Sequence, residues 1–160
     1  MLVRSLALSC LLVAGCGLVD RNLDQGQAVV VLNELLAKAS EGDDWVELLN
    51  TGLAEVELDG MGLSDGAPAW VLPDGTTLQP GELLVIVCDG TGVEGKADLK
   101  LSSDGETVFL VDAEGRTVDE VEFGPQEEDV SWGRYPDGTG DWGPMEPSPG
   151  EPNDAPDTDG

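Results

Sequence analysis

The feature that most constrains this chain is its short alternation of apolar runs with glycine-containing turns. Asp-Gly pairs recur along it, and 22 glycines and 10 prolines interrupt the sequence at short intervals. Glycine adopts positive φ at no steric cost and aspartate bonds to its own nearby backbone, so such pairs are typical of tight turns. The spacing therefore favours many short strands over long helices.

Seven apolar or alternating segments fit strands. They are residues 28–35, 45–50, 53–59, 69–72, 82–89, 106–112 and 117–123. The turn from Asp112 to Gly115 predicts a hairpin between the last two, and residues 35–40 could form one helical turn. A chain of 160 residues with 40% apolar content is expected to build one core, and its strand pattern predicts an all-β sandwich.

The charge balance excludes several classes of function. With 33 acidic residues against 7 basic ones, the formal net charge is −26, which repels nucleic acid and anionic lipid headgroups. The chain contains no histidine, which excludes Ser-His-Asp and Cys-His catalytic sites. An acidic surface attracts cations and basic partners, but it also serves solubility alone.

The N-terminal segment has the features of a targeting signal. Arg4 precedes the apolar run Ser5–Ala14, which is too short to span a bilayer and suits a signal-peptide core. The run ends in VAGC, which resembles a bacterial lipobox, so Cys16 is predicted to be lipidated and to become the mature N-terminus. Gly17 resembles the residue found in lipoproteins sorted to the outer membrane of Gram-negative cells. An ordinary secreted protein is the alternative.

These features divide the chain into four predicted parts. A signal peptide covers 1–15, a lipid-anchored tether 16–27, the folded domain 28–146, and an acidic, Pro/Gly-rich tail 147–160. Cys10 leaves with the signal, so Cys88 is the one unmodified cysteine, and its apolar strand context predicts a small buried side chain.

The many acidic residues could form two kinds of site, a calcium site or a catalytic pair of carboxylates. Acidic residues in or beside turns could converge on a hard cation, but none of the turns has the ligand spacing of an EF-hand, and turn chemistry is the favoured explanation. The calcium candidates are Asp43, Asp44, Asp137 and Asp141, with Asp65, Asp89 and Asp104 in similar turns. With 33 acids, close pairs arise by chance, so we predict no enzyme activity and no cofactor other than this calcium.

Three polar residues interrupt apolar strands. Asn33, Glu34 and Glu47 would destabilise these strands unless they are exposed or paired. Arg134 is a candidate partner for one of the acids, and we expect a structural pairing within the domain in preference to a ligand contact.

The aromatic residues form two groups. Trp45 and Trp70 have apolar neighbours and are predicted to lie in the core. Trp132, Tyr135 and Trp142 border a turn, so they could either fill the core or lie exposed, and they are the candidate ligand surface.

Taken in order, several segments of the chain resemble the lamin-tail domain family. They include DWVELLN (44–50), WVLPDGTTLQPGELLVI (70–86), LKLSSDGETVFLVDAEGRTVDEVEF (99–123), SWGRYPDGTGDW (131–142) and PSPGEPN (147–153). The resemblance implies an immunoglobulin-like β-sandwich of about seven to nine strands, used for attachment or interaction. Some lamin tails bind DNA, but the charge of this chain argues against carrying that property over.

We therefore expect a noncatalytic, lipid-anchored module of the bacterial cell envelope that binds a protein or an envelope polymer. The membrane is its partner through Cys16, and nucleic acid is not a partner. A structural lipoprotein without a specific ligand is the alternative, and a calcium-dependent or hydrolytic surface protein is the third choice.

Overall fold

The computed structural model describes residues 29–66 and 68–155, and these residues form an all-β, antiparallel domain. The domain contains eleven strands. They are β1 (Val30–Leu36), β2 (Trp45–Asn50), β3 (Val56–Glu57), β4 (Gly62–Ser64), β5 (Trp70–Val71), β6 (Thr77–Leu78), β7 (Leu83–Val87), β8 (Glu106–Val111), β9 (Thr117–Phe123), β10 (Ser131–Tyr135) and β11 (Asp141–Met145).

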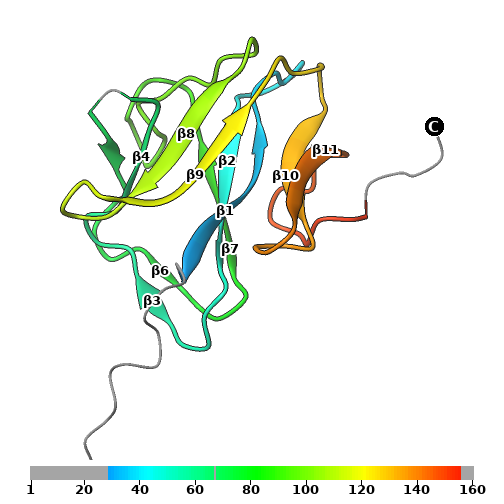
Figure 1. Cartoon of the computed structure of the whole chain (residues 1–160). Coiled ribbons are helices and arrows are strands. Elements are labelled where there is room, and N and C mark those ends of the chain that lie inside the picture. Colours follow the sequence, from blue (N-terminus) through cyan, green and yellow to red (C-terminus); the bar gives the residue numbers. More distant parts are fainter. Residues whose placement is uncertain (1–28, 67, 156–160) are drawn as a thin grey trace, which may run out of the picture.

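Two main sheets face each other in a β-sandwich (Figure 1). The larger sheet has the strand order β11-β10-β1-β2-β7, and the four-stranded sheet has the order β5-β4-β8-β9. The short β3–β6 pair lies at one end of the sandwich, at the bottom of Figure 1. The predicted β-sandwich is therefore correct.

The core lies between the two main sheets. Because successive side chains of a strand point to opposite faces, alternate residues such as Val46 and Leu48 of β2 and Val108 and Leu110 of β8 enter it. Cys88 also lies in this core as a free thiol, and burial raises its pKa to about 12. The prediction that Cys88 is a small buried side chain is thus confirmed.

Each of the seven predicted segments contains a strand, but the described domain has more strands than the expected seven to nine. The seven segments do not include β4, β6, β10 and β11, which are short or contain glycine and bear little apolar periodicity. The helical turn proposed for 35–40 is wrong, because Leu35 and Leu36 complete β1. Pairing with β2 and β10 overrides a weak local preference there.

The predicted hairpin between β8 and β9 is confirmed. The amide of Gly115 donates to the carbonyl of Asp112 at 2.9 Å, which closes the turn. The Asp112 carboxylate also accepts from the amides of Glu114 and Arg116 at 3.0 and 2.8 Å, as expected of an aspartate that organises its own turn.

The predicted boundary at residue 146 requires a correction. Ser148, Gly150 and Asn153 form hydrogen bonds to β1, β2 and β10, so the folded domain continues to Asn153. The predicted signal peptide (1–15) and the whole of the predicted tether (16–27), including Cys16, lie outside the described residues. Among the described residues, no helix is long and apolar enough to cross a membrane.

Candidate functional site

A β-bulge in β1 creates the most polar buried region of the domain. Leu32 pairs with Leu48 and Glu34 pairs with Glu47, which leaves Asn33 as the extra residue between them. The carboxylates of Glu34 and Glu47 are therefore neighbours on the sheet face that points away from the core. Both glutamates and Asn33 are 0% exposed, so each needs hydrogen-bond partners within the protein.

The C-terminal segment Ser148–Asn153 supplies partners for both glutamates. Ser148 donates to the two oxygens of Glu34, from its amide at 3.1 Å and from its hydroxyl at 3.0 Å. The Gly150 amide donates to Oε2 of Glu47 at 2.7 Å. Two buried carboxylates thus hold a segment whose composition alone predicts a free tail.

Asn33 and Asn153 join this segment to the turn between β10 and β11. The side-chain amide of Asn33 donates to Glu47 at 3.1 Å and to Asp137 at 2.9 Å, and its carbonyl accepts from the Gly138 amide at 2.8 Å. The Asn153 amide donates to Asp137 at 3.2 Å, and its side chain donates to the carbonyl of Arg134 at 2.9 Å. We call this group the polar cluster; its members are Asn33, Glu34, Glu47, Asp137, Ser148 and Asn153.

The approach of β10 to the polar cluster requires a glycine. A Cβ atom added at Gly133 would lie 2.7 Å from the sulfur of Met145, 2.9 Å from Nδ2 of Asn153 and 3.0 Å from Cγ of Glu34. Gly133 is the residue of β10 that pairs with Glu34. Because Gly133 has no side chain, the side chains of Glu34, Met145 and Asn153 can pack directly against its backbone.

Burial without a neighbouring cation raises the pKa values of Glu34 and Glu47. Neither glutamate forms an ion pair within the described part of the chain. Burial raises the pKa of Glu47 to about 7 against the opposing effect of its hydrogen bonds from Gly150 and Asn33, and burial likewise raises the pKa of Glu34. Glu47 can therefore hold a proton near neutral pH, and the carboxylate oxygens of both glutamates accept hydrogen bonds from the chain itself.

Arg134 is not the partner of these glutamates, which corrects that prediction. Its guanidinium lies 3.2 Å from the Asp119 carboxylate of β9, and its Nε donates to the carbonyl of Leu32 at 3.0 Å. Because neighbouring residues of a strand point to opposite faces, Gly133 of β10 faces the cluster and Arg134 faces the other way. Asp119 also accepts from the Leu32 amide at 2.9 Å.

The aromatic residues differ in how far they are exposed to solvent. Trp45 is buried, and Trp70, Trp132 and Trp142 are partly buried against the core. Trp142 also lies under Arg134, with its ring centroid 4.9 Å from the guanidinium carbon, and the Trp132 indole nitrogen is buried without a hydrogen-bond partner among the described residues. Of the predicted ligand surface, Tyr135 alone is well exposed, at 41%.

The calcium candidates do not converge. Asp43 forms an ion pair with Lys96, Asp44 accepts from the Ala39 amide at the start of β2, and Asp137 belongs to the polar cluster. Asp141 is exposed at the start of β11. Within residues 29–66 and 68–155 no three acidic or cysteine side chains are grouped to hold a metal ion.

Four residues of this region were missed by sequence reasoning. Asp119 looked like one of many surface acids, and the contacts of Ser148, Gly150 and Asn153 were hidden in a segment assigned to a tail. The one signal for Ser148, Gly150 and Asn153 was the position of PSPGEPN at the end of the ordered series of family-like segments.

Comparison with protein families supplies the identity of the domain. The family model described as Lamin Tail Domain matches residues 24–125, which cover the strands from β1 to β9. No curated protein matches the chain. The matched residues contain Asn33, Glu34 and Glu47, whereas Asp137, Ser148 and Asn153 lie beyond them. With its antiparallel β-sandwich and this match over more than half of its length, the chain belongs to the lamin tail domain family, whose fold is immunoglobulin-like.

Proposed function

We propose that this protein is a noncatalytic interaction module of the bacterial cell envelope, anchored by lipid at Cys16, that binds a protein or an envelope polymer. The outer membrane of a Gram-negative cell is its proposed location, on the basis of Cys16 and Gly17. Nucleic acid is not a proposed partner, because the formal charge is −26.

The observation that carries this proposal is that the buried glutamates accept hydrogen bonds from the domain's own C-terminal segment. Glycoside hydrolysis needs two carboxylates that are open to a substrate on either side of the scissile bond. Glu34 and Glu47 lie beneath the segment Ser148–Asn153 and accept its hydrogen bonds. This arrangement supports a structural role for the acid pair and leaves binding to the exterior.

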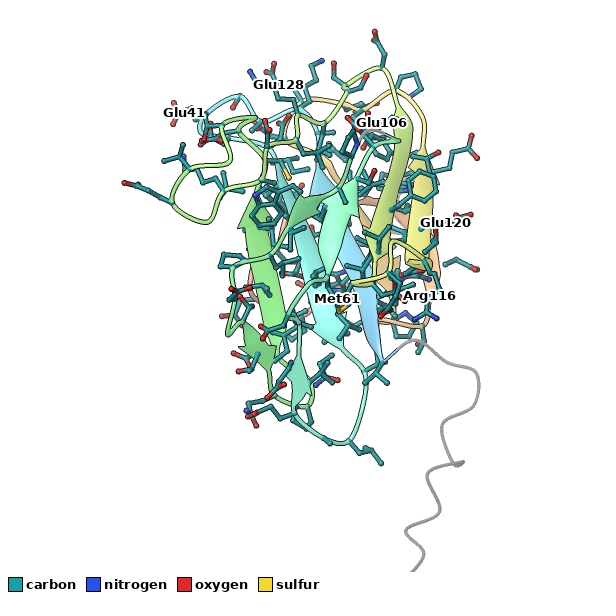
Figure 2. All side chains as sticks on the ribbon, turned by 90° about the vertical axis from the view of Figure 1, so that its left-hand side faces the viewer. Glu41, Met61, Glu106, Arg116, Glu120 and Glu128 are labelled. Atoms are coloured by element: carbon teal, nitrogen blue, oxygen red, sulfur yellow. The ribbon has the colours of Figure 1, made fainter. Side chains whose placement is uncertain are left out.

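The exterior favours cationic partners. The labelled carboxylates Glu41, Glu120 and Glu128 lie on the outside of the domain in Figure 2. Arg116 and Lys96 are both paired with aspartates, which reduces the positive charge that could offset these acids. Tyr135 adds an exposed aromatic ring beside the β10–β11 turn.

The lipid anchor is tested by growing cells that express the full chain with radiolabelled palmitate. Wild-type protein is expected to incorporate the label, and Cys16→Ser is expected to lose it. Equal labelling of the two proteins would contradict lipidation at Cys16.

The binding role is tested with the purified full chain against envelope glycans and envelope proteins, in calcium and in chelator. We expect saturable binding that weakens in Tyr135→Ala, with Tyr135→Phe as the control that keeps the ring. Absence of binding in both conditions would favour the alternative, a structural lipoprotein without a specific ligand. Binding in calcium alone, or hydrolysis of a polymer, would favour the third choice.

A further inference from the structure

The two main sheets have four edge strands, and they differ in how their edges are protected. The edges are β11 and β7 in the larger sheet and β5 and β9 in the smaller one. An unprotected edge offers free backbone groups for pairing with another chain, and proteins commonly block it with proline, charges or very short strands. β5 has two residues, and β11 contains Pro144.

The edge of β9 is closed by its own charged side chains. The Asp119 carboxylate accepts from the amide of Glu120 at 2.9 Å and from the amide of Leu32 at 2.9 Å. Glu120 and Glu122 are exposed along the same strand. These charges oppose the addition of a further strand to β9.

β7 contains no proline and no charged residue, and it is five residues long. It reads Leu-Leu-Val-Ile-Val, and its residues Leu83, Leu84, Val85 and Val87 are partly exposed. The strand, green in Figure 2, lies at the border of the ribbon on the side opposite β9. An apolar, partly exposed edge of this kind is suited to pairing.

The backbone hydrogen bonds of β7 show which of its groups remain available. The Asn50 amide donates to the carbonyl of Glu82 at 3.1 Å, and the Cys88 amide donates to the carbonyl of Asp44 at 2.8 Å. Bonding alternates along an antiparallel pair, so Leu83, Val85 and Val87 direct their amides and carbonyls away from β2. The carbonyl of Val87 accepts from the Ala97 amide at 2.7 Å, whereas Leu83 and Val85 bond to no described residue on that side.

We propose that β7 is a docking edge at which an extended, cationic segment of another protein adds a strand to the five-stranded sheet. The free amides and carbonyls of Leu83 and Val85 would supply its main-chain hydrogen bonds. The formal charge of −26 selects a cationic partner and disfavours a second copy of this chain. This inference deepens the proposed function and rests on its choice of a binding role.

The test uses the full chain and a short capped peptide of alternating lysine and valine, with hydrogen exchange of single amides as the readout. We expect the peptide to slow exchange at Leu83 and Val85 and to leave the amides of β9 unchanged. A peptide with glutamate in place of lysine is expected to bind at least about tenfold more weakly. Val85→Pro removes one outward amide and should weaken binding about tenfold, whereas Val85→Thr keeps the amide and the affinity.

A charge-matched pair of variants keeps the test valid if Val85→Pro does not fold. Leu83→Lys combined with Val85→Lys makes the net charge more positive by two, and Glu122→Lys on β9 makes it more positive by the same amount. The double variant is expected to lose peptide binding and the β9 variant to retain it. Unchanged exchange at Leu83 and Val85, or equal loss in both variants, would overturn the proposal.

A second copy as the occupant would also contradict it. Sedimentation of the full chain would then show a dimer whose formation protects Leu83 and Val85 in the absence of peptide. The proposed function fails on other readouts, namely palmitate labelling and binding to envelope material, so the two failures are distinguishable.

Discussion

Two groups of charged residues hold the β10–β11 region to the rest of the domain, and they do so by different chemistry. On the outer face of the larger sheet, Glu34 and Glu47 are buried and receive hydrogen bonds from neutral amide and hydroxyl groups. On the other side of β10, Asp119 is paired with the cation Arg134. The first group buries carboxylates without a cation, and the second pairs its carboxylate with one.

This difference predicts two kinds of response. Uncompensated carboxylates are sensitive to pH, because burial favours their protonated form. A compensated pair is instead sensitive to the removal of one partner, which leaves the other charge partly buried and alone. The predictions below separate these responses, beginning with the largest expected effect.

Truncation after Glu146 should have the largest effect, because it removes the partners of both glutamates together with Asn153. We expect the free energy of unfolding to fall by about 3 kcal/mol, measured by urea denaturation at neutral pH. Removal of residues 156–160 alone is the control, since it leaves every hydrogen bond of the cluster in place. Equal stability of the two truncated proteins would show that the C-terminal segment does not stabilise the domain.

Asp119→Ala should be next in size. It leaves the guanidinium of Arg134 without its carboxylate and the Leu32 amide without an acceptor, and we expect a loss of about 2 kcal/mol. Asp119→Asn keeps an acceptor for Leu32 and should lose less. Wild-type stability in Asp119→Ala would contradict a structural role for this pair.

The pH dependence of Glu47 should be smaller. Its pKa in the folded state is about 7 against an ordinary value of 4.5, so the folded protein binds the proton more tightly. The stability from this group is complete below about pH 4.5 and is lost as the pH rises through 7. Glu47→Gln should flatten the decline between pH 5 and 8.

Glu120→Gln is the matched control for this pH profile, since it removes one carboxylate from the exposed face of β9. General repulsion among the many acids would be reduced about equally in the two variants. If Glu120→Gln flattened the profile as strongly as Glu47→Gln, burial of Glu47 would not be the cause of the decline.

The smallest effect is expected for the exposed ion pairs of the β8–β9 turn. The Arg116 side chain is 74% exposed and lies 2.7 Å from Asp112. Solvent screens such a pair, so Arg116→Ala should change the melting temperature by less than about 2 °C. A loss comparable to that of Asp119→Ala would remove the distinction between buried and exposed pairs.

The sequence indicated which residues of the polar cluster need partners, but not which partners they have. Asn33, Glu34 and Glu47 interrupt apolar strands, and that pattern alone predicts pairing inside the domain. The partner of Arg134 depends on which face of β10 points toward Glu34, and this follows from a strand register that no local pattern encodes. Asp119 belongs to a strand of the other sheet, so its contact with Arg134 was equally hidden.

The C-terminal segment was mispredicted for a different reason. Its proline and glycine content indicates a segment that cannot bury an apolar face of its own. The structure holds it by hydrogen bonds from Ser148 and Gly150 to carboxylates, which require no apolar residues. Composition was therefore a fair guide to the strands and a poor one to this segment.

Hydrogen exchange at the amides of Ser148, Gly150 and Asn153 in the full wild-type chain tests this account most directly. Each amide donates to a carboxylate of the polar cluster, so all three should exchange slowly, and Gly150 should lose its protection in Glu47→Ala. Exchange of the three amides at the rate of an unstructured peptide would contradict the claim that buried glutamates hold this segment in the domain.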